Sequence, residues 1–123
     1  MKKDAFTIVE VLAAIVVVGL SLVAVMSMIS MGHAQNQLDK ERLIAADLLV
    51  RKMEEIKSIG FANAANQTNF TYSGYSNFPL DVTITANYSG NANLMKVDTT
   101  VRWMNIYNIS ESHQVSTLLA NYP

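Results

Sequence analysis

The chain has 123 residues, a formal net charge of −1 and no cysteine. This length is typical of one domain, and the absence of cysteine excludes disulfide bonds and thiolate metal sites. Nucleic acid is not expected as a partner, because the nine Lys and Arg residues form no basic stripe.

An apolar segment covers residues 6–31, and its one charged residue is Glu10. As an α-helix the segment would be about 39 Å long, and about 20 apolar residues already span a bilayer core. Lys2 and Lys3 precede it, which predicts a cytoplasmic N-terminus and an extracytoplasmic remainder. A secretory signal peptide has a shorter apolar core of about 7–15 residues. The small residues around His33 nevertheless leave open a cleavage that would start the mature chain at Gln35.

The helical pattern continues beyond the apolar segment, since no proline occurs before Pro79. Gly60 is a plausible helix C-cap, with Lys57 in the last turn, so the pattern predicts one helix from Phe6 to Ile59. One face of its second half is expected to pack on a small head. The residues of that face are Leu38, Arg42, Ala45, Leu49, Met53 and Ile56.

Residues 61–79 are rich in Asn, Ser and Gly and are predicted to be a loop. Residues 81–88, 96–103 and 113–119 alternate with period two, which predicts strands, and residues 89–93 form a turn. A small sheet of this kind needs cover on its apolar face, which the helix supplies. The predicted fold class is therefore α+β: a long N-terminal helix on an antiparallel sheet of about three to four strands. Trp103 is expected at the centre of that contact.

The opening "KKDAFTIVEVLAAIVVVGLSLV" resembles the class III signal peptide and N-terminal helix of type IV pilins and pseudopilins. In that family a short basic leader precedes a cleavage site before a Phe, and a Glu follows within the mature chain. The resemblance implies a leader at residues 1–5, cleavage between Ala5 and Phe6 by a prepilin peptidase, and N-methylation of Phe6. It also implies a transmembrane assembly helix at residues 6–32 and a pilin-like head at residues 33–123.

The resemblance further implies a role for Glu10, whose carboxylate would pair with the new N-terminal amine of a neighbouring subunit. The implied partners are other pilin or pseudopilin subunits, the peptidase, an inner-membrane assembly platform and, before assembly, the lipid bilayer. The alternative is that Glu10 lies in the lipid headgroup region and has no such partner.

The chain departs from the major pilins at two positions, and the second of them favours a minor subunit. Ala5 stands where the family mostly has Gly, and Ser27 stands where a major pilin commonly has a kinking proline. The segments "ADLLVRKMEEIKSIGF" and "NLMKVDTTVRWMN" also resemble the PilV and GspI group of minor subunits. A major pilin remains an alternative.

Other chemistry finds little support in the sequence. His33 and His113 lie far apart, and Asp98 and Glu111 occupy expected strand or loop positions, so no enzyme, no metal site and no cofactor are expected. Calcium binding is not favoured, because Asp81 and Glu111 are isolated. A membrane-anchored adhesin that uses loop 61–79 is an alternative of a different class. Four N-glycosylation sequons begin at Asn66, Asn69, Asn87 and Asn108, and in a chain so rich in Asn they are consistent with coincidence.

Overall fold

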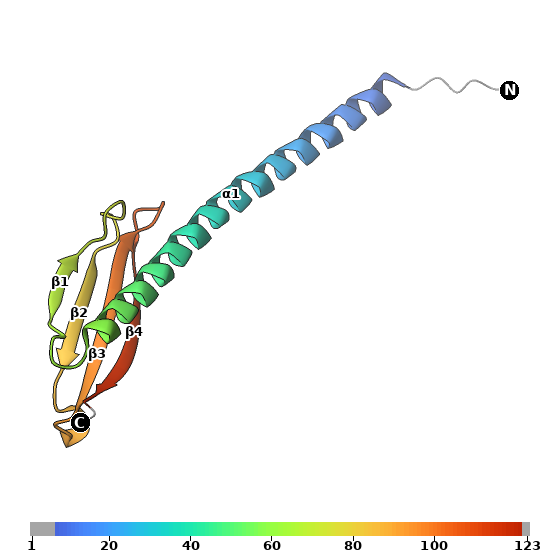
Figure 1. Cartoon of the computed structure of the whole chain (residues 1–123). Coiled ribbons are helices and arrows are strands. Elements are labelled where there is room, and N and C mark those ends of the chain that lie inside the picture. Colours follow the sequence, from blue (N-terminus) through green and yellow to red (C-terminus); the bar gives the residue numbers. More distant parts are fainter. Residues whose placement is uncertain (1–6, 122–123) are drawn as a thin grey trace. The chain divides into compact units, whose positions relative to one another are not determined.

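The computed structural model describes residues Thr7–Asn121, and Figure 1 shows the order of its elements. The helix α1 (Ile8–Ile59) comes first. The strands β1 (Gln67–Phe70), β2 (Leu80–Thr85), β3 (Leu94–Met104) and β4 (Ser110–Ala120) follow, with a short 3-10 helix η1 (Tyr88–Gly90) between β2 and β3. The chain divides into two compact units between Gln37 and Leu38, and each unit is described by itself.

The expected α+β fold is confirmed. In the second unit, called here the head (residues 38–121), the sheet has the order β1-β2-β3-β4 and every neighbouring pair is antiparallel. The C-terminal part of α1, drawn in green in Figure 1, packs on one face of this sheet. This helix-on-sheet arrangement is pilin-like. The sheet has four strands, one more than the three segments with period-two alternation of apolar and polar residues.

The face of α1 that meets the sheet is close to the predicted one. Its buried residues are Ala45, Leu48, Leu49, Lys52, Met53 and Ile56. Leu38 is half-buried and Arg42 is exposed, so the predicted stripe extends too far toward the N-terminus. Leu48 and Lys52 were missed because a helix that packs on a sheet buries a face wider than a single stripe.

Gly60 ends α1 as predicted. Its backbone has φ of +82°, and its amide donates to the carbonyl oxygen of Ile56 at 3.2 Å. A residue without a Cβ adopts this left-handed conformation without strain, so the chain turns back toward the sheet here.

The sheet contributes alternate residues to the core. Along β3 the buried side chains are Met95, Val97, Thr99, Val101 and Trp103. Trp103 is 3% exposed and lies in one core cluster with Ala45, Leu48 and Leu80, so its predicted central place is confirmed. Apolar burial on this face of the sheet is what fixes the register of the strands.

Two strand predictions were wrong. The segment 61–79 is not all loop, because β1 lies within it; this strand is short and carries a register shift, so it leaves no period-two signal. The strand after residue 80 ends at Thr85, and Tyr88 lies in η1 instead. Ser89 and Gly90 both have positive φ there, which an extended strand does not allow.

Lys52 is the least expected member of the core. Its side chain has no exposed surface, and its Nζ lies 3.7 Å from the centre of the Phe70 ring. The same Nζ donates to Glu55 at 2.9 Å, and the Tyr72 hydroxyl donates to the other Glu55 oxygen at 2.7 Å. A buried ammonium is stable only when it is paired in this way. The cluster attaches β1 and the residues after it to α1.

We predict that Lys52→Ala lowers the free energy of unfolding by about 2–4 kcal/mol, because it leaves a cavity and removes the partner of Glu55. Lys52→Met keeps the aliphatic chain and is expected to lower it by about 1 kcal/mol. Urea unfolding of the detergent-solubilised full-length chain, followed by the fluorescence of the single tryptophan, measures both. Equal stability of Lys52→Ala and the unchanged protein would contradict the role of this cluster.

Candidate functional site

The predicted cleavage residues Ala5 and Phe6 lie outside the described residues, which begin at Thr7. The other predicted site residue, Glu10, lies in the first turn of α1. The candidate site is therefore described from Thr7 onward.

Thr7 and Glu10 form a reciprocal pair at the start of α1. The Glu10 amide donates to Thr7 Oγ1 at 3.3 Å, and the Thr7 amide donates to Glu10 Oε2 at 3.4 Å. This is the capping box, in which a Thr at the N-cap and a Glu three residues later satisfy each other's free amides. Thr7 was not among the predicted site residues, although the T-x-x-E spacing before an apolar run is the sequence signal of a capping box.

From Thr7 to His33 every residue is exposed, although most of them are apolar. The exposed fraction of Ile8 is 81% and that of Met31 is 74%. The helix is long enough and apolar enough to span a membrane, by length and composition. Within the described chain, nothing covers this half of α1.

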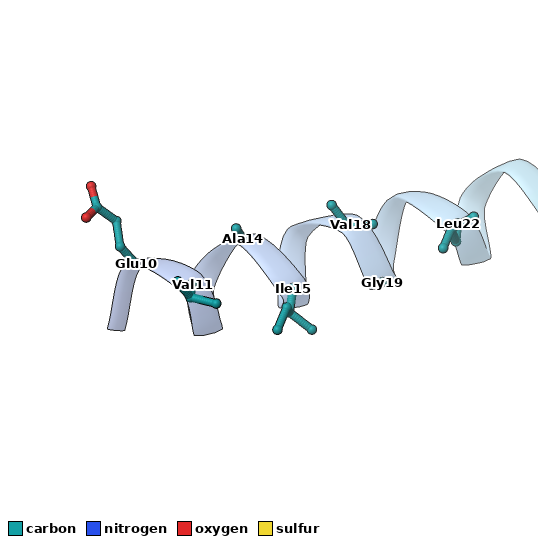
Figure 2. A pocket seen from close by; sticks show the side chains of 7 residues that line it. All are labelled: Glu10, Val11, Ala14, Ile15, Val18, Gly19 and Leu22. Carbon is teal, nitrogen blue, oxygen red and sulfur yellow. The ribbon is translucent and has the colours of Figure 1, made fainter. Parts of the chain in front are cut away.

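A shallow apolar groove follows Glu10 along α1. Figure 2 shows its lining residues, which are Glu10, Val11, Ala14, Ile15, Val18, Gly19 and Leu22. A Cβ built on Gly19 would meet no atom within 4 Å, so the chain itself does not need a glycine there. Glycine inside a helix costs about 1 kcal/mol relative to alanine. Small residues on an apolar helix allow another helix to approach closely.

In the head, Glu111 and Asn105 form a network of structural contacts. Glu111 lies on β4, not in a loop as expected, and accepts from Asn105 Nδ2 at 2.8 Å and from Arg42 Nε at 3.2 Å. The hydrogen bond from Asn105, followed by that from Arg42, holds the pKa of Glu111 below its ordinary value of 4.5. Asn105 also accepts from two amides of the β3–β4 turn, so these contacts fix that turn on α1.

A second carboxylate, Asp98, lies on the outer face of the sheet, far in the sheet register from Glu111. It pairs with Lys96 Nζ at 3.0 Å and accepts from the Ser116 hydroxyl. The Ser116 hydrogen bond, followed by that from Lys96, lowers the pKa of Asp98. Asp98 and Glu111 are therefore satisfied separately and form no catalytic pair.

The two histidines do not come together. His33 is exposed on α1, and the ring of His113 lies 5.2 Å from that of Trp103 on the sheet. Among residues 7–121, no group of three or more His, Asp or Glu side chains is arranged to hold a metal ion.

The asparagines of the sequons have structural roles. Asn69, Asn87 and Asn108 have positive φ, which asparagine tolerates better than most residues. The Asn66 side chain accepts from the Ile84 amide at 2.7 Å. Backbone geometry therefore accounts for three of these asparagines, and a hydrogen bond to the backbone accounts for Asn66.

The segment 61–79, in which an adhesin site was the alternative, contributes most of its large side chains to the core. Phe70, Tyr72 and Phe78 pack against the cluster around Trp103. Tyr75 is 38% exposed. This segment therefore serves the packing of the head.

Comparisons of the chain with models of protein families, with curated proteins and with solved structures gave no match.

We predict that Thr7→Val speeds amide exchange in the first turn of α1 by about fivefold, because losing an N-cap side chain costs about 1 kcal/mol. Thr7→Ser keeps the hydroxyl and is the matched control. Hydrogen exchange of the full-length chain in micelles, read at residues 8–11 by mass spectrometry, measures the effect. Identical exchange of the Val and Ser variants would contradict the capping box.

A second prediction concerns pH. The pKa of Glu111 is lower in the folded than in the unfolded protein, so its contribution is fully present above pH 4.5 and is lost as the pH falls through the folded-state value. We expect Glu111→Gln to reduce the loss of thermal stability on acidification below pH 4.5. Thermal unfolding of both proteins across this range tests it, and parallel pH profiles would contradict it.

Proposed function

We propose that the protein is a minor pilin or pseudopilin, a structural subunit that primes or caps a type IV pilus or a type II secretion pseudopilus. The observation that carries the proposal is an exposed apolar half-helix with one carboxylate, Glu10, near its start. The resemblance of residues 2–23 to the class III signal peptide supports the same interpretation.

In the proposed mechanism the apolar half of α1 leaves the lipid bilayer and packs against the apolar helices of other subunits. The subunit waits in the inner membrane with its N-terminus in the cytoplasm and its head outside, as Lys2 and Lys3 favour. A prepilin peptidase removes residues 1–5 and methylates the Phe6 amine. An assembly platform then moves the helix from lipid into contact with the helices of other subunits.

Glu10 is the residue whose free energy differs most between the lipid and the fibre. A carboxylate within the hydrocarbon costs on the order of 2–3 kcal/mol. A buried carboxylate that faces a cation is retained at much lower cost. In the proposed fibre this cation is the Phe6 amine of a neighbouring subunit. The groove that begins at Glu10 and passes Gly19 gives that neighbour a path of close approach.

The capping box gives Glu10 a second partner within its own chain. The Thr7 amide donates to one oxygen of the Glu10 carboxylate, Oε2. In the proposed function the carboxylate caps its own helix before assembly and faces the amine of a neighbour in the fibre.

We predict that Glu10→Val and Glu10→Gln both leave membrane insertion and leader removal intact but reduce incorporation into fibres by at least about tenfold. The reason is that a buried amine without its partner costs about 3–5 kcal/mol. The sheared-fibre fraction, quantified by immunoblot, measures incorporation.

Two comparisons separate charge from capping. Glutamine keeps the capping box but removes the charge, so Glu10→Gln isolates the ion pair. Ser21→Val is the matched control, since the Ser21 hydroxyl donates to the Val17 carbonyl of the same helix. Normal incorporation of both Glu10 variants would refute the proposal for this residue.

A further inference from the structure

The connections at the two ends of β3 differ in composition. The connection that leads into β3, residues 87–93, is rich in Asn, Ser and Gly, which is ordinary for a turn in water. The turn that leads out of β3, residues 105–109, carries Tyr107 and Ile109, which are 59% and 58% exposed. Residues 103–110 contain no charge. Residues 105–109, called here the apolar turn, therefore present apolar and aromatic side chains at one end of the head.

The apolar turn has a fixed conformation. The Asn105 side chain is buried, and its Oδ1 accepts from the amides of Tyr107 and Ile109 at 2.9 and 3.0 Å. Its Nδ2 donates to Glu111 at 2.8 Å. Asn108 has φ of +61°, and its amide donates to the Asn105 carbonyl oxygen at 2.8 Å. The head thus holds Tyr107 and Ile109 in one arrangement, although both side chains are mostly outside its core.

The hydrogen bonds of the apolar turn are made within the turn itself. The amides of residues 105, 107, 108 and 109 all donate to acceptors of residues 105 or 109. Where water is absent, an amide without an acceptor is costly, so this arrangement suits contact with lipid. A strand from another protein, by contrast, binds through main-chain groups that are still free.

The apolar turn lies at the end of the head where α1 enters. Glu111 accepts from the turn and also from Arg42 Nε at 3.2 Å, and Arg42 is within the first five residues of the head. The next residue of α1, Leu43, is 71% exposed. Exposed apolar side chains of the head therefore gather near the point where the chain arrives from the apolar segment.

The connection between this end of the head and the apolar segment is short. Residues 32–37 lie between them and are part of α1. As a helix these residues extend about 9 Å, and even a fully extended chain of this length reaches about 20 Å. The headgroup layer of a bilayer is itself about 5–8 Å thick. With the apolar segment in a membrane, this end of the head therefore stays beside the headgroups.

The structure assigns the apolar turn as a second membrane contact, through which the head rests on the phospholipid surface before assembly. Tyr107 lies at the level of the headgroups, where tyrosine is enriched in membrane proteins, and Ile109 enters the edge of the hydrocarbon. Two side chains bind a bilayer weakly, so the contact orients the head and α1 anchors it. This inference rests on the proposed function, because the bilayer is the environment of the subunit before it enters a fibre.

Fluorescence quenching in vesicles tests the inference in the full-length chain, which has no cysteine of its own. Ser110→Cys places an environment-sensitive dye beside the apolar turn. The labelled protein is reconstituted into phosphatidylethanolamine–phosphatidylglycerol vesicles, with and without a lipid that carries a quencher near its headgroup. We expect the quencher to lower the emission at least about twofold. Ala92→Cys places the same dye at the opposite end of β3, where we expect no quenching.

Substitution of the two side chains separates the apolar turn from the dye. In the Ser110→Cys protein, Tyr107→Ser together with Ile109→Ser is expected to remove most of the quenching. Both changes leave the hydrogen bonds of the turn in place, because these use main-chain amides and Asn105. Leu118→Ser is the matched control, since Leu118 is a 52% exposed apolar residue near the other end of β4, and we expect it to leave the quenching unchanged. Trp103 fluorescence checks that the head of each variant is folded.

Three results in vesicles overturn the inference: no quenching at residue 110, equal quenching at residues 110 and 92, or quenching that survives the double substitution. A thiol at residue 110 that is unquenched in vesicles but protected from a maleimide in fibres would assign the turn to another subunit, and it would overturn the inference as well.

A dye at Val25→Cys separates this failure from failure of the proposed function. Val25 lies within the apolar segment, so a quencher deep in the acyl chains reports whether α1 is in the membrane. If the dye at residue 25 is quenched and the dye at residue 110 is not, the turn contact alone is wrong. If the dye at residue 25 is not quenched, the proposed function fails and the turn contact fails with it.

Discussion

The C-terminal half of α1 packs on the sheet, whereas its apolar N-terminal half is uncovered. The function of the protein must provide an environment for this uncovered half. From Ala45 to Ile56, α1 buries one face against the sheet. From Thr7 to His33 every residue is exposed. Burial of apolar surface is worth about 25 cal/mol per Å², so this half of the helix favours an apolar environment, which residues 7–121 do not provide. Lipid and the helices of other subunits are the two environments that the proposed function uses in succession.

In the proposed fibre, Glu10 would give the uncovered half of α1 a direction and a specific contact. Apolar side chains alone pack in many registers, whereas a carboxylate that needs a cation favours one of them. In the capping box the same carboxylate also accepts a hydrogen bond from the Thr7 amide and so stabilises the start of α1. Apolar burial would thus hold the helices together, and Glu10 would set which positions meet.

The parts of the fold that were predictable from sequence are those with local causes. The end of α1 follows from the conformation of Gly60, and the buried face of β3 follows from its alternation up to Trp103. The burial of Lys52 was not predictable, because its aromatic partner Phe70 is 18 positions away in the chain and a lysine usually indicates solvent. The capping box was readable from T-x-x-E and was overlooked. Cleavage before Phe6 stays a prediction, since that residue lies outside the described chain.

The proposed pairing of Glu10 needs both a helix that stays attached to the head and a new amine at its start, so the N-terminus of the mature protein decides between the alternatives. Intact-mass and N-terminal peptide analysis of the protein purified from its own membranes reads this end. We expect a mature chain that begins with methylated Phe6. A chain that begins at Gln35, or one that keeps residues 1–5, would contradict it.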